Sequence, residues 1–281
     1  EIAAGDASTS TIISVQNSLA CGITMKYGTH AQKEEWLKPL ARGDKLGCFC
    51  LTEPHTGSDA SAITTRADRD GDSFVLNGVK QFITTGKHAQ MAIVFAVTDK
   101  MAGKKGISCF LVPTATPGFI VGRTEEKMGQ HASDTVQIIL ENCRVPASAL
   151  LGKEGEGYRI ALSNLEAGRI GIAAQSIGMA RAAFEAAVRY AKERVTFGVP
   201  IIEHQAVNFR LADMNTLLDA ARLMVWRADV VRAMPQTAAF YKIAGMGVNL
   251  RGLAFEGLKI STETVNNKPV LLIEGAIVDI T

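Results

Sequence analysis

The stretch CFCLTEPHTGSD, residues 48–59, contains residue types that could hold an anionic ligand. Its apolar start predicts a strand that runs into a loop punctuated by Pro54 and Gly57. Gly57 allows a ligand to approach the backbone closely, and neighbouring N–H groups with the Ser58 hydroxyl could hold a phosphate. An ordinary polar turn would contain the same residues, so the spacing alone leaves both interpretations open.

Two cysteines lie just before this loop, and Cys48 and Cys50 share one face of the predicted strand. The sequence has neither a second such pair nor a histidine cluster or an HExxH motif, so burial as small apolar residues is favoured over a metal site. The 5 cysteines are odd in number and lack framework spacing. Free thiols in a reducing compartment are therefore expected.

Helices are predicted on the N-terminal side of the loop, over residues 1–45. A second helix of this zone should begin at Thr29 and end at Gly43. The apolar residues that recur at helical spacing are Ile12, Ile13, Val15, Leu19, Ile23, Trp36, Leu37 and Leu40.

Short apolar runs bounded by turn signals predict an antiparallel sheet over residues 46–150. The turn signals are Asp70-Gly71-Asp72, Pro117-Gly118 and Pro146, and the main runs are residues 74–76, 91–97, 107–112 and 135–140. Asn77-Gly78 lies between two valines and predicts a hairpin turn.

Helical periodicity returns over residues 155–232, interrupted at Gly198-Val199-Pro200. Beyond residue 232 the pattern is atypical, and residues 270–273 fit a strand or a buried helix turn equally well. The expected fold is α+β, with three domains. These are a partial N-terminal helical domain (1–45), a middle antiparallel β-domain (46–150) and a C-terminal helical bundle (151–281).

Composition excludes several classes of protein. The 281 residues carry a formal net charge of +2, which does not indicate nucleic-acid binding. No apolar run is long enough to predict a membrane span. Neither a Rossmann GxGxxG after a strand nor a P-loop motif occurs. Residues 1–6 resemble no signal or transit peptide and lack a starting Met, so we expect the sequence to come from a longer or processed chain.

Five motifs in order resemble the acyl-CoA dehydrogenase family, and its short-chain branch in particular. They are TEPHTGSD (52–59), LNGVKQFITT (76–85), KMG (127–129) with Ser133, Thr135 and Val145-Pro146, LEAGRIGIAAQ (165–175), and RVTFGVPI (194–201) with Gln205 and LADM (211–214). The resemblance covers about residues 8–232, and it implies the fold of that family.

The resemblance implies that the chain binds FAD. The residues expected to contact it are Phe49, Leu51, Thr52, Gly57, Ser58, Phe82, Ile83, Thr84, Arg194, Phe197, Gln205, Gly245, Met246 and Gly247. Thr84 would lie near the flavin N5, where a hydrogen bond favours the reduced ring. Phe82 stands where the family usually has Trp, so ring packing is kept and the indole N–H is lost.

Arg194 and Gln205 are expected to reach the FAD of a neighbouring subunit. Arginine suits a pyrophosphate because its planar fork binds two oxygens. A homodimer or homotetramer is therefore expected, with electron-transferring flavoprotein as the electron acceptor. The compartment would be a bacterial cytoplasm or a mitochondrial matrix.

The implied reaction is α,β-dehydrogenation of a short acyl-CoA thioester, in which a carboxylate removes an α-proton while the flavin accepts the β-hydrogen. Residues expected to contact the substrate are Ser58, Glu166, Ala167, Gly168, Arg169 and Gly275, with Ser133 as a further candidate. Some members place the base in an "LDxER" segment, where this chain has Gly168. Others place it in "YEGTSEIQ", which LIEGAIVDI (272–280) resembles loosely, so Glu274 is the expected base and Glu256 a second candidate.

Two alternatives remain open from the sequence. One is an acyl-CoA oxidase type of flavoenzyme, in which oxygen reoxidises the flavin. The other is a scaffold or partner subunit with impaired catalysis. The segment between Arg232 and Ile243 is shorter than the corresponding segment of the family by about the length of one helix.

Overall fold

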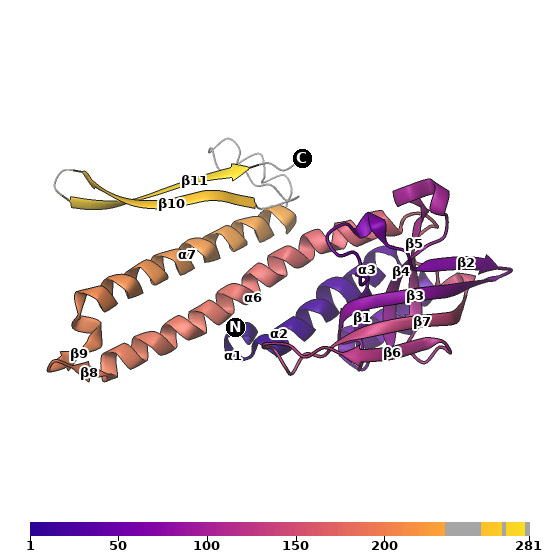
Figure 1. Ribbon diagram of the computed structural model, residues 1–281, viewed down its shortest axis with the longest axis horizontal. Coiled ribbons are helices and arrows are strands. Elements are labelled where there is room, and N and C mark those ends of the chain that lie inside the picture. The colour runs from indigo at the N-terminus through magenta and orange to yellow at the C-terminus, as the bar shows by residue number, and fades with distance from the viewer. Residues whose placement is uncertain (234–253, 266–267, 279–281) are drawn as a thin grey trace. The chain divides into compact units, whose positions relative to one another are not determined.

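The computed structural model describes residues 1–233, 254–265 and 268–278. The described residues divide into two compact units, Glu1–Arg222 and Leu223–Thr281. The first unit contains helices followed by a sheet and a long helix, as expected from the sequence (Figure 1). The division into three domains at residues 45 and 150 stays a prediction.

The N-terminal helices confirm the predicted helical zone. A capping box opens the second group, because the Thr29 hydroxyl accepts the Gln32 N–H and the Gln32 side chain accepts the Thr29 N–H. Gly43 closes it with φ 80°, the left-handed conformation that glycine adopts readily. The segments are α1 Ile2–Gly5, α2 Ala7–Ser14, π-helical η1 Val15–Cys21, α3 Gly22–Tyr27, α4 His30–Gln32, π-helical η2 Lys33–Leu37 and α5 Lys38–Arg42.

The middle of the chain forms a 7-stranded sheet in the order β1-β4-β2-β3-β7-β6, with β5 paired to β4, within the described residues. Most pairs are antiparallel, but β1 and β2 each pair with β4 in parallel. The expectation of a purely antiparallel sheet was therefore too simple. The strands are β1 Gly47–Cys50, β2 Arg66–Asp70, β3 Ser73–Thr84, β4 Met91–Val97, β5 Ile107–Pro113, β6 Phe119–Thr124 and β7 Thr135–Pro146, joined partly by short 3-10 turns, η3 Ala60–Ala62, η4 Lys100–Gly106 and η5 Ala147–Ala149.

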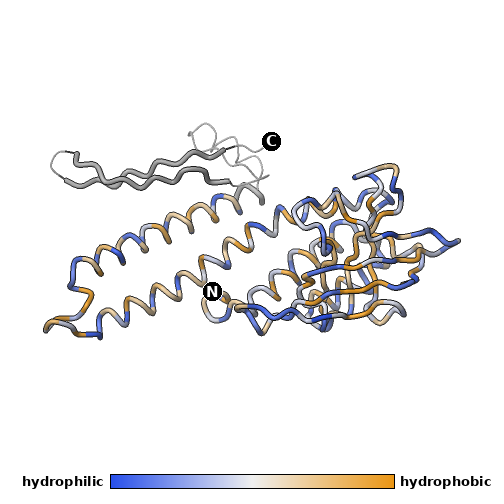
Figure 2. Tube along the Cα trace, viewed as in Figure 1, coloured by the Kyte–Doolittle hydropathy of each residue, from blue (hydrophilic) through white to orange (hydrophobic). Residues whose placement is uncertain are grey.

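Strands β4 and β5 are buried along almost their whole length, which explains why they read as unbroken apolar runs. One face packs on Ile23, Trp36 and Leu40 of the N-terminal helices and on the start of the long helix that follows the sheet. The other face packs against side chains of β3 and β7, including Phe74 and Ile138. Figure 2 shows how hydrophobic residues concentrate in these strands.

The predicted hairpin at Asn77-Gly78 is wrong, because both residues lie inside strand β3. An added Cβ at Gly78 would lie only 2.4 Å from the Thr65 Oγ1. Gly78 also has φ 155° and sits at an irregularity in the pairing of β3 with β7. The glycine thus permits a close backbone approach, whereas the hairpin turn lies at Gly71 between β2 and β3.

Helix α6 (Gly157–Glu193) and helix α7 (Gln205–Ala233) confirm the predicted C-terminal helices. Between them lie β8 Val195–Thr196, β9 Val199–Pro200 and η6 Ile201–Glu203. Strands β10 Ala254–Val265 and β11 Lys268–Val278 form an antiparallel pair. Residues 270–273, for which the sequence allowed a strand or a helix turn, therefore lie in a strand. The expectation of a helical domain up to residue 281 does not hold for β10 and β11.

Candidate functional site

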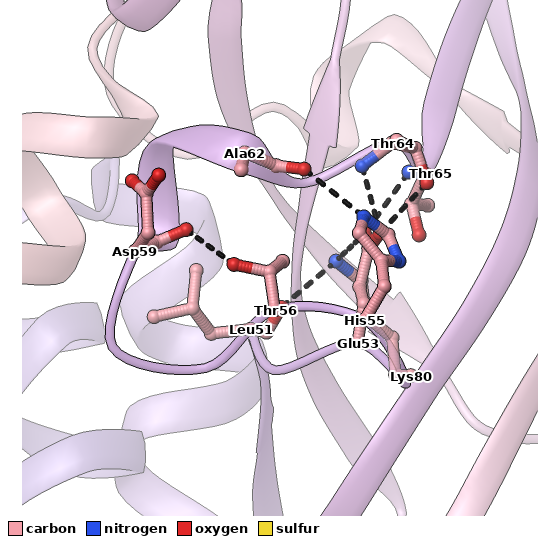
Figure 3. Close-up of polar contacts among 9 residues, drawn as sticks. All are labelled: Leu51, Glu53, His55, Thr56, Asp59, Ala62, Thr64, Thr65 and Lys80. Atoms are coloured by element: carbon pink, nitrogen blue, oxygen red, sulfur yellow. Dashed lines mark hydrogen bonds and ion pairs between the residues drawn. The ribbon is translucent and has the colours of Figure 1, made fainter.

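The loop after β1 is built around a buried carboxylate, that of Glu53 (Figure 3). Its Oε2 accepts the Thr64 N–H at 2.7 Å and the Thr64 hydroxyl at 2.9 Å. Its Oε1 accepts the Thr65 N–H at 2.9 Å. The carboxylate thus ties the start of the loop to the segment that returns it to β2.

Lys80 of β3 completes this network from below the loop. Its Nζ lies 2.8 Å from Glu53 Oε1 and donates to the Leu51 carbonyl at 3.2 Å. Both side chains are inaccessible, with 0% of Lys80 and 1% of Glu53 exposed. An isolated buried charge is strongly unfavourable, so each ion depends on the other.

The pKa values of the pair reflect this dependence. Burial would raise the pKa of the Glu53 carboxyl, but the Lys80 charge and the hydrogen bonds from Lys80, Thr65 and Thr64 outweigh it and hold this pKa at about 2. Burial lowers the pKa of the Lys80 ammonium, and the Glu53 charge opposes that shift. Glu53 is therefore ionised at neutral pH.

Gly57 and Ser58 lie at the exposed tip of the same loop. The loop is closed on itself by paired backbone hydrogen bonds between Glu53 and Thr56, at 2.9 and 3.1 Å. The Thr56 hydroxyl adds a bond to the Asp59 carbonyl at 2.6 Å. A fixed, solvent-facing tip with a glycine and a hydroxyl fits the sequence prediction of a phosphate contact.

The end of β3 presents an aromatic ring in a strained conformation. Phe82 has φ 58° and is 61% exposed, and Thr85 has φ 66°. Positive φ is uncommon for residues with side chains and persists where the surroundings enforce it. Ile83 between them is buried. The ring is thus held at the surface, where it could stack on a flat ligand.

A cleft of about 630 Å³ opens beside Thr84. It is lined by helical residues and by the segment before β7, namely Asp6, Ala7, Ser8, Thr11, Thr84, Lys127, Gly129, Gln130, Ser133, Thr135 and Met179. A second cleft of about 410 Å³ shares Lys127, Ser133 and Thr135 with it. The Ser133 and Thr85 hydroxyls are buried without a hydrogen-bond partner. Buried hydroxyls without partners mark positions where a bound ligand would be stabilised.

The four residues 166–169 lie on α6, in the first half of that helix, and Glu166, Gly168 and Arg169 do not line either of these two clefts. Glu166 and Gly168 are half-buried and Arg169 is exposed. Met179, which does line the larger cleft, follows them by about three helical turns. Substrate contacts by Glu166, Ala167, Gly168 and Arg169 therefore stay predictions.

Phe197 lies at the tip of the β8–β9 hairpin and is 98% exposed. Phe197 and Gly198 have φ 51° and 82°, which makes the connection a two-residue turn of the type that suits hairpins. The Thr196 hydroxyl and His204 Nε2 lie 2.9 Å apart and fasten the hairpin to the chain before α7. Arg194, which precedes the hairpin, and Gln205, which begins α7, are both exposed.

This hairpin lies at the end of α6 far from the sheet (Figure 1). About 15 residues, roughly 20 Å of helix, separate Arg194 from the cleft residue Met179. A single copy therefore leaves Arg194, Phe197 and Gln205 away from the loop at Ser58.

Several predicted site residues fall at the end of the chain. Gly245, Met246 and Gly247 lie outside the described residues. Glu274 and Gly275 lie in β11, and Glu274 is opposite Lys259 of β10 in the register. Glu256, the second candidate base, is opposite Ala276.

The sequence analysis missed the Glu53–Lys80 pair, although a signal for it exists. Phe74, Leu76 and Lys80 have the same parity along β3, and all three are buried. A lysine on the inward face of a strand requires an acidic partner. Glu53, two residues after the buried Leu51 in the adjoining loop, supplies that carboxylate.

The predicted thiol pair is buried as well, with Cys48 Sγ and Cys50 Sγ 3.8 Å apart. Across the described part of the chain, no group of three or more His, Cys, Asp or Glu residues is arranged to hold a metal ion. No helix in that part is both long and apolar enough to cross a membrane.

Comparison with known proteins places these features in a family. Three family models match in order: the N-terminal domain of acyl-CoA dehydrogenases over residues 1–44, the middle domain over 48–143 and the C-terminal domain over 155–244. The chain belongs to the acyl-CoA dehydrogenase family. Members of this family are FAD flavoproteins of fatty acid metabolism, and the family belongs to the oxidoreductases.

Similar proteins include short-chain members of the acyl-CoA dehydrogenase family. The mitochondrial short-chain specific acyl-CoA dehydrogenase of Rattus norvegicus is 49% identical over 232 residues, 83% of this chain and 56% of that protein. The butyryl-CoA dehydrogenase structure from Megasphaera elsdenii has a TM-score of 0.81 at 45% identity, over 83% of this chain and 61% of that one. A glutaryl-CoA dehydrogenase from Mycobacterium smegmatis in complex with FADH2 has a TM-score of 0.78 at 40% identity, over 83% and 58%.

The chain thus spans little more than half the length of the curated relatives it matches. The family models end at residue 244, so Gly245, Glu274 and Gly275 lie beyond the matched segments. The loop at Glu53 and the end of β3 both lie within the matched middle domain.

Proposed function

We propose that the chain is an FAD-dependent acyl-CoA dehydrogenase that converts short acyl-CoA thioesters to 2-enoyl-CoA. The main support is the arrangement of the loop tip at Ser58, the exposed ring of Phe82 and the adjoining cleft with the buried Ser133 hydroxyl. Short-chain relatives and a neighbour that binds FADH2 support the substrate class and the cofactor.

The residues at this site fit FAD. Phe49, Leu51, Thr52, Gly57 and Ser58 would hold the flavin and its pyrophosphate from the loop, with Phe82, Ile83 and Thr84 along the ring. The exposed Phe82 ring offers an aromatic face, and the buried Thr85 hydroxyl lacks a partner beside it. FAD would supply the acceptor for the β-hydrogen of the substrate.

The cleft beside Thr84 would take the acyl-CoA. Its residues come from both the helices and the sheet, so a bound thioester would contact both. The Ser133 hydroxyl, buried without a partner, would donate to or accept from the ligand. Removal of the weakly acidic α-proton needs a carboxylate, for which Glu274 is our candidate and Glu256 the alternative.

A homo-oligomer would complete the cofactor site, because one copy leaves Arg194 and Gln205 away from the loop. Exposed apolar side chains support self-association. They include Phe197 at 98% exposure, Phe209 at 60% and Leu217 at 47%. Electron-transferring flavoprotein is the proposed electron acceptor, in a bacterial cytoplasm or a mitochondrial matrix.

Product analysis tests this proposal. The chain is reconstituted with FAD and incubated with butyryl-CoA and an artificial electron acceptor, and 2-butenoyl-CoA is measured by mass spectrometry. Product from wild type but not from Glu274→Gln supports the reaction and the base, whereas loss only in Glu256→Gln reassigns the base. Hydrogen peroxide formed stoichiometrically in air, without the artificial acceptor, would indicate an oxidase. Bound FAD without product would indicate a catalytically impaired partner subunit.

A further inference from the structure

Two stretches of chain that we assign to flavin binding are fastened to each other beneath the surface. Three consecutive loop residues bond to two consecutive residues of β3. Lys80 Nζ bonds to the Leu51 carbonyl at 3.2 Å and to the Glu53 carboxylate at 2.8 Å. The Gln81 N–H donates to the Thr52 carbonyl at 2.8 Å.

We call these bonds from Lys80 and Gln81 to residues 51–53 the brace, and its placement is specific. Lys80 and Gln81 directly precede Phe82, so the brace ends where the exposed ring begins. On the loop side it holds residues 51–53, and Gly57, the first residue of the exposed tip, follows Glu53 by four residues. Glu53 also binds the Thr64 and Thr65 N–H groups, so both ends of the loop are anchored to one carboxylate (Figure 3).

Stability alone does not account for an ion pair at this position. Apolar residues of similar volume in place of a buried ion pair often give equal or greater stability. The strand face that carries Lys80 is otherwise apolar, with Phe74 and Leu76 at the same parity. An apolar pair could not form the directed hydrogen bonds that Lys80 Nζ makes to the Leu51 carbonyl and the Glu53 carboxylate.

We propose that Glu53 and Lys80 are positioning residues that fix the spacing between the loop tip at Ser58 and the ring of Phe82, and thereby set the affinity for the flavin. This inference rests on the proposed function. Neither side chain contacts the ligand, because their polar atoms are already bonded under the loop to each other and to Leu51, Thr64 and Thr65. The low pKa of Glu53 keeps its carboxylate charged across the neutral range, available to the Lys80 Nζ at 2.8 Å.

The expected consequence is a loss of affinity without loss of the fold. If the Glu53 and Lys80 side-chain bonds are removed, the loop keeps its internal hydrogen bonds between Glu53 and Thr56 and the single backbone bond from Gln81 to Thr52. One bond in place of three fixes the distance between the loop and Phe82 less tightly. Misplacement of a binding group by about 1 Å is enough to reduce binding or rate by an order of magnitude or more.

The test measures FAD binding to the apoprotein by quenching of flavin fluorescence, with thermal unfolding of the same apoprotein by circular dichroism. The variants are Glu53→Gln, Lys80→Met and the double variant Glu53→Gln/Lys80→Met. Gln32→Met is the matched control, because Gln32 is also a buried tether and bonds to the Ser148 and Leu150 carbonyls, away from the loop. If Lys80→Met does not fold, FAD binding by the isosteric Glu53→Gln variant is compared with that of wild type and of Gln32→Met.

The double variant is expected to raise the dissociation constant for FAD by about tenfold or more, although no unpaired charge remains in it. Gln32→Met is expected to lower the melting temperature but leave the dissociation constant within about twofold. A double variant that binds FAD like wild type would overturn the positioning role alone. Wild-type protein that takes up no FAD would overturn both this inference and the proposed function, so the two failures are distinguishable.

Discussion

Acid should destabilise the apoprotein in a way that depends on Glu53. The pKa of this carboxyl is held at about 2, against an ordinary value of 4.5. A group whose folded pKa is depressed contributes stability above its unfolded pKa, and that contribution is lost as the pH falls through the folded pKa. The relevant window is therefore about pH 4.5 to 2.

The size of the effect follows from the shift. Each pKa unit corresponds to about 1.4 kcal/mol, so the difference between 4.5 and about 2 amounts to on the order of 3 kcal/mol of unfolding free energy. Glu53→Gln removes the titrating group. The stability advantage of wild type over this variant should therefore be largest near neutral pH and shrink by about 3 kcal/mol towards pH 2.

Urea unfolding of the apoprotein at several pH values between 7 and 2 measures this difference. Glu154→Gln serves as the control, because Glu154 is exposed and pairs with Arg69 on the surface at 2.7 Å. Exposed pairs contribute little, so its profile should run parallel to that of wild type. A Glu53→Gln variant whose stability also ran parallel to wild type would refute the inferred electrostatics of the buried pair.

Three further results are expected. Gly78→Ala should cost at least about 2 kcal/mol of stability in urea unfolding, because its Cβ would meet Thr65 Oγ1 at 2.4 Å. The control Gly5→Ala, with no atom within 4 Å of the added Cβ, should be nearly neutral. Equal costs for the two variants would contradict the close approach at Gly78. Phe197→Asn should leave unfolding unchanged or slightly improved, since Asn-Gly suits the turn, but weaken self-association in sedimentation velocity; unchanged association would count against the exposed ring as a contact. Thiol labelling of the native protein at pH 8 should reach Cys21 before the four buried cysteines, and early labelling of Cys109, whose pKa is raised by burial, would contradict the fold.

The sequence predicted the helices and most strands because their apolar periodicity follows directly from burial. It failed at Asn77-Gly78, because a local turn signal cannot show that Thr65, distant along the chain, packs against the glycine. Motifs in the sequence predicted Phe82 and Ser58 as site residues, but they could not reveal that Phe82 adopts φ 58° or that the Ser133 hydroxyl is buried without a partner. These properties arise from tertiary contacts, as does the partnership of Glu53 with Lys80.

The most direct test of the central claim is an anaerobic absorbance titration of the FAD-reconstituted chain with butyryl-CoA. The account predicts that the protein takes up FAD and that the oxidised flavin band near 450 nm bleaches as substrate is added. A protein that stays colourless after reconstitution, or a flavin band that butyryl-CoA leaves unchanged, would contradict it.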